Sequence, residues 1–269
     1  MGSLSLLKQS LNYPIKDKKD FIVIAVILSL TQIVDFILIS ILNINSSAII
    51  STITLFFNMI IFGYLLNVIK SKIKNHDEMP IFYFRKNLIP GVKASILRLI
   101  YFIIPIFFTV ILSFFLKYKI DILHKIPELI LLILKQSYTL KGSANALYVF
   151  SDLIFHNLFL AVFALILLII FDIAGFIAIG RLAETNSLRE GLKVKKIFKK
   201  IRSIGWSKYI HWYVIFVIFT IIYTLFTAII SLIPIVGVYI VSFILAPYYL
   251  LFKYREIGIM YKQSKNNEF

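Results

Sequence analysis

Residues 171–212 read FDIAGFIAIGRLAETNSLREGLKVKKIFKKIRSIGWSKYIHW, and this stretch decides how the rest of the chain is interpreted. An apolar run ends at Arg181, and Ser187 with Glu190 three residues later forms a capping-box pattern that predicts a new helix. On that helix, apolar side chains share one face and cations occupy the other. The apolar residues are Val194, Ile197, Phe198, Ile201 and Ile204, and the cations are Lys193, Lys195, Lys196, Lys199, Lys200 and Arg202. The pattern predicts a membrane-spanning helix followed by a basic amphipathic helix in the membrane plane.

Composition points to a polytopic membrane protein. Hydrophobic residues make up 60% of the 269 residues, charged residues make up 16%, and the mean hydropathy is +0.90. A net charge of +16 would suggest nucleic acid in a soluble chain, but here we expect the cations to flank membrane spans and no nucleic acid to be bound. There is no cysteine, which excludes disulfides, thiolate catalysis and cysteine-ligated metals.

Six segments are apolar over about 20 residues, the length that crosses a bilayer as a helix. We expect spans at Phe21–Leu42, Ala48–Ile69, Ile96–Leu116, Leu153–Ile179, Trp212–Ile233 and Val236–Phe252. The links between spans one and two and between spans five and six are short enough to predict antiparallel hairpins. The sequence therefore predicts an all-α membrane protein in which residues 1–269 form a single polytopic domain.

Basic residues are distributed unevenly between the two sides of these spans. Twenty-four of the 29 lysines and arginines fall on one side, and the other five lie within Lys117–Lys141. Since cytoplasmic loops carry the excess of basic residues, both termini are predicted to be cytoplasmic, with the protein in the cell membrane.

The spans group into three parallel hairpin units, at about 1–69, 75–179 and 187–262, each preceded by a cytoplasmic amphipathic basic helix. The second of these helices is predicted over Phe82–Arg98. Between spans three and four, Ile122–Leu134 is expected to lie on the outer surface, because thirteen residues with a proline are too few to span. If this segment did enter and cross the membrane, the number of spans would be odd instead of even.

Polar residues within the predicted spans are candidates for function because they are costly in hydrocarbon. Asp35 and Asp172 are the ionisable ones. Gln32, Asn58, Thr224 and Thr227 lie in other predicted spans or at similar depths. One interpretation is a polar pathway for a solute, and the other is hydrogen bonding that holds helices together. Pro105 and Pro247 predict kinks in spans three and six.

Catalytic signatures are absent from the sequence. It contains no zinc-protease motif, phosphate-binding glycine loop or nucleophile elbow, and the four histidines fall in different segments. His76, Asp77 and Glu78 are adjacent, which favours a solvated turn over a metal site. We therefore expect no enzymatic activity, no metal and no cofactor.

Short motifs along the chain carry a family resemblance. They include Gly63-Tyr64-Leu65-Leu66, Asp77-Glu78-Met79-Pro80, Gly180-Arg181-Leu182-Ala183-Glu184, Ile233-Pro234-Ile235-Val236-Gly237 and Ala246-Pro247-Tyr248. In order and spacing the chain resembles the prokaryotic, often archaeal, membrane family catalogued as domain of unknown function 4013. One departure is that Ile81-Phe82-Tyr83-Phe84-Arg85 replaces the Trp and acidic residues usual after the Asp-Glu loop. The resemblance implies no established activity.

Two functional hypotheses remain. The first is a non-enzymatic scaffold or accessory protein whose cytoplasmic amphipathic helices bind anionic lipid head groups or a membrane or cytoplasmic protein partner. The alternative is a transporter or channel for a small solute or ion that uses the intramembrane polar layer.

Overall fold

The protein is described by a computed structural model covering residues 3–16, 18–36, 47–116, 158–233 and 236–263. Every regular element in these ranges is helical. The elements are α1 (Ser3–Leu11), η1 (Tyr13–Ile15), α2 (Lys18–Phe36), α3 (Ser47–Ile73), α4 (Phe84–Phe115), α7 (Leu158–Thr185), α8 (Leu188–Gly191), α9 (Val194–Ile204), α10 (Trp206–Ser231), α11 (Val236–Ile240), η3 (Val241–Leu245) and α12 (Ala246–Lys262).

Four of the described helices are long and apolar enough to cross a membrane. They lie at Thr54–Ile73 in α3, Phe84–Phe115 (α4), Leu158–Thr185 (α7) and Trp206–Ser231 (α10). The chain is thus an all-helical integral membrane protein. The predicted first and sixth spans are not among these four, and the predicted outer segment Ile122–Leu134 lies outside the described residues.

Helices α3 and α4 cross at two glycines, which bring their backbones into contact. A Cβ on Gly63 would lie 1.7 Å from the carbonyl oxygen of Asn87, and one on Gly91 would lie 1.6 Å from that of Met59. Next to the crossing, the amide of Asn67 donates to Oδ1 of Asn87 at 2.9 Å. Any side chain at either glycine would push the helices apart, so the sequence must supply glycine at both positions.

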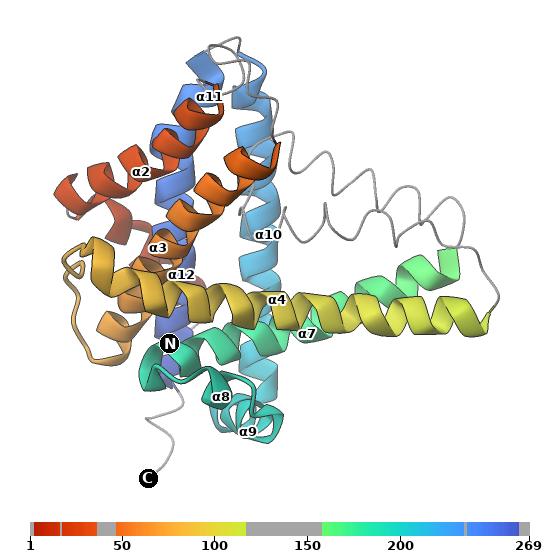
Figure 1. The fold of residues 1–269 in the computed structure, drawn as a ribbon. Coiled ribbons are helices and arrows are strands. Elements are labelled where there is room, and N and C mark those ends of the chain that lie inside the picture. Colours follow the sequence, from red (N-terminus) through yellow and green to blue (C-terminus); the bar gives the residue numbers. More distant parts are fainter. Residues whose placement is uncertain (1–2, 17, 37–46, 117–157, 234–235, 264–269) are drawn as a thin grey trace.

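Helix α4 runs without interruption from Phe84 to Phe115, so the prediction of a separate amphipathic helix over Phe82–Arg98 is wrong. The basic first half and the apolar second half form one rod that packs along α7 (Figure 1). In the same view α10 and α12 run at a steep angle to α4 and α7. The described helices therefore do not reproduce the predicted parallel stack of three hairpins.

The predicted sixth span is divided by a π-helical turn, η3, which ends next to Pro247. Proline has no N–H to donate to the carbonyl one turn earlier, and a wide turn accommodates the missing bond. The N–H of Ala246 donates to the carbonyl of Val241, five residues back. A kink was predicted at Pro247, and the structure shows a change of helix type next to it.

Helix α12 lies at the centre of the packing. Nearly every residue from Ala246 to Tyr261 is buried, including Arg255 and Glu256. The N-terminal segment docks on it: the hydroxyl of Ser10 donates to the carboxylate of Glu256, and Arg255 stacks on the ring of Tyr13 at 4.3 Å. From α10, Nε1 of Trp212 donates to the same carboxylate at 2.7 Å. Burial raises the pKa of Glu256 above its ordinary value.

Candidate functional site

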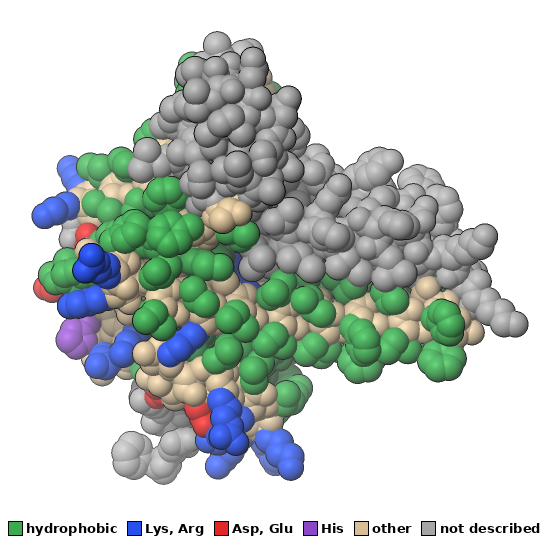
Figure 2. Space-filling view, viewed as in Figure 1, with side chains coloured by type: hydrophobic (Ala, Val, Ile, Leu, Met, Phe, Trp, Pro, Cys, Tyr) green, Lys and Arg blue, Asp and Glu red, His purple; other side chains and the backbone are tan. Residues whose placement is uncertain are grey.

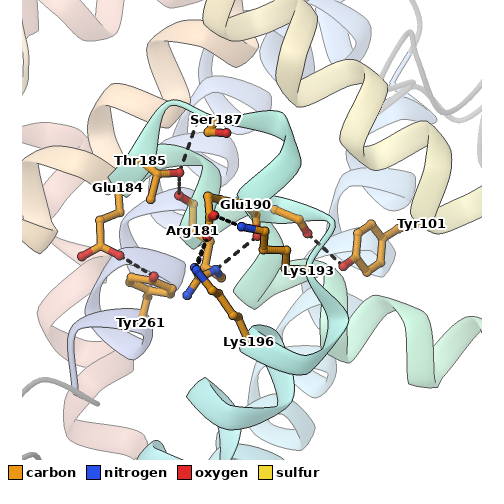
Figure 3. A network of polar contacts seen from close by, with 10 residues as sticks. Tyr101, Arg181, Glu184, Thr185, Ser187, Glu190, Lys193, Lys196 and Tyr261 are labelled. Carbon is orange, nitrogen blue, oxygen red and sulfur yellow. Dashed lines mark hydrogen bonds and ion pairs between the residues drawn. The ribbon is translucent and has the colours of Figure 1, made fainter.

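Glu190 joins the end of α7 to α8 and α9 through three cations (Figure 3). Its Oε2 lies 2.6 Å from Nη2 of Arg181 and 3.0 Å from Nζ of Lys196, and its Oε1 accepts a short bond from Lys193. The hydroxyl of Tyr101 on α4 also donates to the carbonyl of Gly191 at 3.1 Å. Hydrogen bonds from Lys193, Lys196 and Arg181 stabilise the ionised carboxylate and hold the pKa of Glu190 at about 2. The network fixes α8 and α9 against the end of a membrane helix.

The capping box predicted for Ser187 is not formed. Ser187 precedes α8, but its side chain makes no cap bond, and Glu190 reaches across to other helices instead. Helix α8 spans only four residues, and a second helix, α9, begins at Val194. Hydrogen bonds from three cations stabilise the Glu190 carboxylate more than a bond from one backbone N–H would, because charge-assisted hydrogen bonds are stronger. The predicted single basic helix is therefore two helices.

The six predicted cations divide into a structural set and an exposed set. Lys193 and Lys196 pair with Glu190, and Nζ of Lys200 lies 4.3 Å above the centre of the Tyr261 ring. The Tyr261 hydroxyl in turn donates to Glu184 at 2.6 Å. The exposed set is Lys195, Lys199 and Arg202, whose side chains make no hydrogen bond or ion pair to any residue that the structure describes.

The predicted apolar face of α9 also divides in two. Ile197, Ile201 and Ile204 are buried against the rest of the protein, where α9 packs on α7, α8 and α10. Val194 and Phe198 remain 57% and 41% exposed. The face predicted to enter the membrane is thus largely used for packing within the protein, because α9 is held down by the Glu190 network.

The exposed part of this face continues into α10. The ring of Phe198 lies 5.9 Å from that of Trp206, which is 44% exposed at the first position of α10. Between the two helices, Gly205 has a φ of +95°, a left-handed conformation that glycine adopts at least cost, and it lets the chain turn sharply. We call the residues Val194, Lys195, Phe198, Lys199, Arg202 and Trp206 the α9 surface. This surface combines exposed apolar rings with unpaired cations.

The predicted intramembrane polar layer does not converge in the part of the chain that the structure describes. Asn58 donates to the carbonyl of Thr54 at 3.0 Å, one turn back on its own helix. Thr224 and Thr227 likewise donate to carbonyls of α10, and Thr224 is exposed. The side chains of Gln32 and Asp35 lie outside the described residues, although their backbone belongs to α2. The side-chain donors of Asn58, Thr224 and Thr227 thus bond within their own helices and need no partner on another helix.

Asp172 is the described member of the predicted layer that does bond to another helix. Its Oδ2 accepts a hydrogen bond from the hydroxyl of Tyr213 on α10 at 2.9 Å. The predicted turn at His76–Glu78 is also more connected than expected. Asp77 pairs with Lys72 and Arg255, which lowers the pKa of its carboxyl. No group of metal-ligating side chains occurs among the described residues.

Sequence reasoning missed three charged residues that the fold buries or brings together. Arg98 lies near the start of the predicted span Ile96–Leu116, and in α4 its guanidinium stacks on the ring of Phe62 from α3. Lys253 and Arg255 were counted after span six, although α12 continues to Lys262. The apolar run of the predicted sixth span ends at Phe252, so hydropathy alone places Lys253 and Arg255 outside the packed helices. A helix that continues past Phe252 was the signal that could have found these two residues.

These features define a helical integral membrane protein with a cation-rich region at one end of its apolar helices. The chain belongs to the family described as "Protein of unknown function (DUF4013)", which matches residues 46–235. This finding confirms the resemblance seen in the sequence motifs. No curated protein and no solved structure matches the chain.

Proposed function

We propose that this protein is a non-enzymatic membrane scaffold or accessory protein that binds anionic lipid head groups through the α9 surface. The observation that carries the proposal is the juxtaposition of Lys195, Lys199 and Arg202 with the exposed rings of Phe198 and Trp206. Tryptophan is enriched at the membrane interface, and basic residues beside it attract anionic lipids. Each such cation contributes about 1 kcal/mol near an anionic surface.

The position of this surface relative to α10 supports a lipid over a protein partner. Ile210, Val214 and Ile218 follow Trp206 at helical spacing and are also exposed. An exposed apolar stripe on a helix long enough to span belongs in hydrocarbon, so its first residues belong at the head-group level. The Glu190 network holds α9 at that end of the stripe.

The distribution of charge supports the proposed orientation, with the charged end and both termini on the cytoplasmic side. Figure 2 shows hydrophobic side chains along the arm made by α4 and α7, while lysines and arginines gather at the other end and around α8 and α9. Within this proposal the six spans remain an expectation. The alternative of solute transport is less well supported, since Thr224, Thr227 and Asn58 bond to their own helices.

The experiment uses the two tryptophans of the chain, Trp206 and the buried Trp212. The full-length protein is placed in nanodiscs whose phosphatidylglycerol or phosphatidylcholine carries brominated chains, which quench tryptophan within contact distance. Subtracting the emission of Trp206→Phe isolates the Trp206 signal. We expect quenching at least twofold stronger with phosphatidylglycerol.

Charge variants test the cause. Changing Lys195, Lys199 and Arg202 together to glutamine should abolish the difference between the two lipids. A control with the same loss of charge changes Lys16, Lys18 and Lys74, which are exposed on other elements, and should keep the difference. Equal quenching by both lipids in the unmodified protein, or no quenching of Trp206, would refute the proposal and point to a protein partner.

A further inference from the structure

A cavity of about 370 Å³ lies between α4, α7, α10 and α12. Charged side chains from three helices line it: Arg98, Asp172 and Lys253. Much of the remaining wall is apolar and includes Phe102 and Ile169. Pockets of this size accept small organic ligands, and a few polar groups in an apolar wall fix their orientation.

The cavity holds two cationic side chains and one carboxylate. Asp172 accepts a hydrogen bond from Tyr213, and it forms no ion pair with Arg98 or Lys253. Arg98 stacks on the ring of Phe62 at 4.8 Å, yet its Nη1 is buried without a hydrogen-bond partner among the described residues. Lys253 lies over the ring of Phe176, with Nζ 5.4 Å from the ring centre. A buried guanidinium nitrogen without an acceptor is costly, so an anion in the cavity would relieve it.

Two of the tyrosine hydroxyl groups that line the cavity are already used as donors. Tyr213 donates to Asp172, and Tyr101 donates to the carbonyl of Gly191. The charged donors that line the cavity are the guanidinium of Arg98 and the ammonium of Lys253. A ligand that suits them carries several acceptor oxygens and a net negative charge.

The three charged residues also mark a boundary on their helices. From Leu99 to Phe115 α4 has no charge, and from Leu158 to Phe171 α7 has none. Before Lys253, residues 236–252 are uncharged as well. The cavity therefore lies where the charged ends of the helices give way to uncharged runs. In a membrane protein this boundary is the level of the lipid phosphates.

We propose that this cavity binds a phosphate-bearing anion, with Arg98 and Lys253 as its donors. Two cations against one carboxylate leave an excess of positive charge. Donors arriving from two helices suit the several oxygens of a phosphate better than the coplanar oxygens of a carboxylate. At about 30 Å³ for each group the size of a water molecule, the cavity has room for roughly a dozen such groups. A bare phosphate is smaller than this, so the cavity also has room for an organic substituent. The cavity is separate from the α9 surface, and neither proposal depends on the other.

The test measures binding to the full-length protein purified in a neutral detergent. Native mass spectrometry gives apparent affinities for phosphatidylglycerol and for phosphatidylcholine, and calorimetry measures inorganic phosphate. Arg98→Gln and Lys253→Gln should each weaken the binding of the anionic ligand at least tenfold. Arg98→Lys should restore part of the loss. Lys18→Gln with Lys74→Gln, two exposed lysines outside both proposed sites, should leave this binding unchanged.

Asp172→Asn distinguishes binding from a structural role. Asparagine still accepts from Tyr213, so the packing is kept while a negative charge is removed, and affinity for the anion should rise severalfold. Because this variant gains affinity, the prediction survives even if the cation variants fail to fold, which a thermal melt would reveal.

The outcomes separate two sources of phosphate. Binding of phosphatidylglycerol alone with these charge dependences assigns the site to a lipid, whereas binding of inorganic phosphate with the same dependences assigns it to a soluble ligand. Both support the proposal. Unchanged affinity in Arg98→Gln and Lys253→Gln, or weaker binding in Asp172→Asn, would overturn it, and Trp206 quenching would be unaffected by that failure.

Discussion

Replacing Gly63 by alanine should force α3 and α4 apart. The new Cβ would lie 1.7 Å from the carbonyl oxygen of Asn87 and 2.6 Å from its carbon, whereas an ordinary contact begins at 3.4 Å. Both helices present backbone at this point, so no side chain can rotate away, and the separation must grow by roughly 1.7 Å. Gaps of half that size already lose a quarter to a half of the dispersion energy between atoms. We expect a loss of about 3 kcal/mol, the upper range for overpacking.

The assay is unfolding of the purified protein by SDS in mixed micelles, followed by the emission of the buried Trp212. The matched control is Gly175→Ala on α7, where the new Cβ would meet only ring atoms of Tyr101 at 3.8 Å. Both variants add one methyl group to a long apolar helix. Alanine favours helix over glycine by about 1 kcal/mol, so Gly175→Ala should be neutral or stabilising.

The difference between the two variants carries the test. If Gly63→Ala unfolds at the same SDS fraction as the unmodified protein, α3 and α4 do not cross in contact at this glycine. If Gly175→Ala loses as much stability as Gly63→Ala, the cost belongs to any added methyl group and the argument from close approach fails.

Three further predictions concern the charged end. Glu256→Leu removes the carboxylate to which Ser10 and Trp212 donate and should cost about 2–5 kcal/mol in SDS unfolding, with a clearly smaller loss in Glu256→Gln. The pKa of Glu190 is about 2, below its ordinary 4.5, so its network should stabilise the protein above pH 4.5, and this stabilisation should be lost as the pH falls toward 2. Glu190→Gln should therefore remove this part of the pH dependence of thermal unfolding. Single cysteines at Ser3 and Ser203 should resist an impermeant thiol reagent in cells, while one at Ser143 should react, and the reverse pattern would invert the proposed orientation.

Several features of this protein were readable from the sequence because they depend on local composition. Apolar runs of about 20 residues predicted membrane helices, and α3, α4, α7 and α10 confirm four of them. Motifs such as Gly63-Tyr64 and Gly180-Arg181 carried the family resemblance, which the match over residues 46–235 confirms. Pro247 predicted a kink, and the structure places a π-helical turn just before it. Apart from the family match, each of these features is set by residues within a few helical turns of one another.

The choice of partners for the charged residues was decided only by the tertiary structure. Ser187 and Glu190 match a capping box in sequence, yet Glu190 is taken by Arg181 on the preceding helix. Glu256 accepts from Ser10, 246 residues away. Such pairings depend on where helices cross, and the crossings depend on close contacts between distant segments, as at Gly63 and Asn87. Periodicity reports which face of a helix is apolar, but the crossings determine which charges meet.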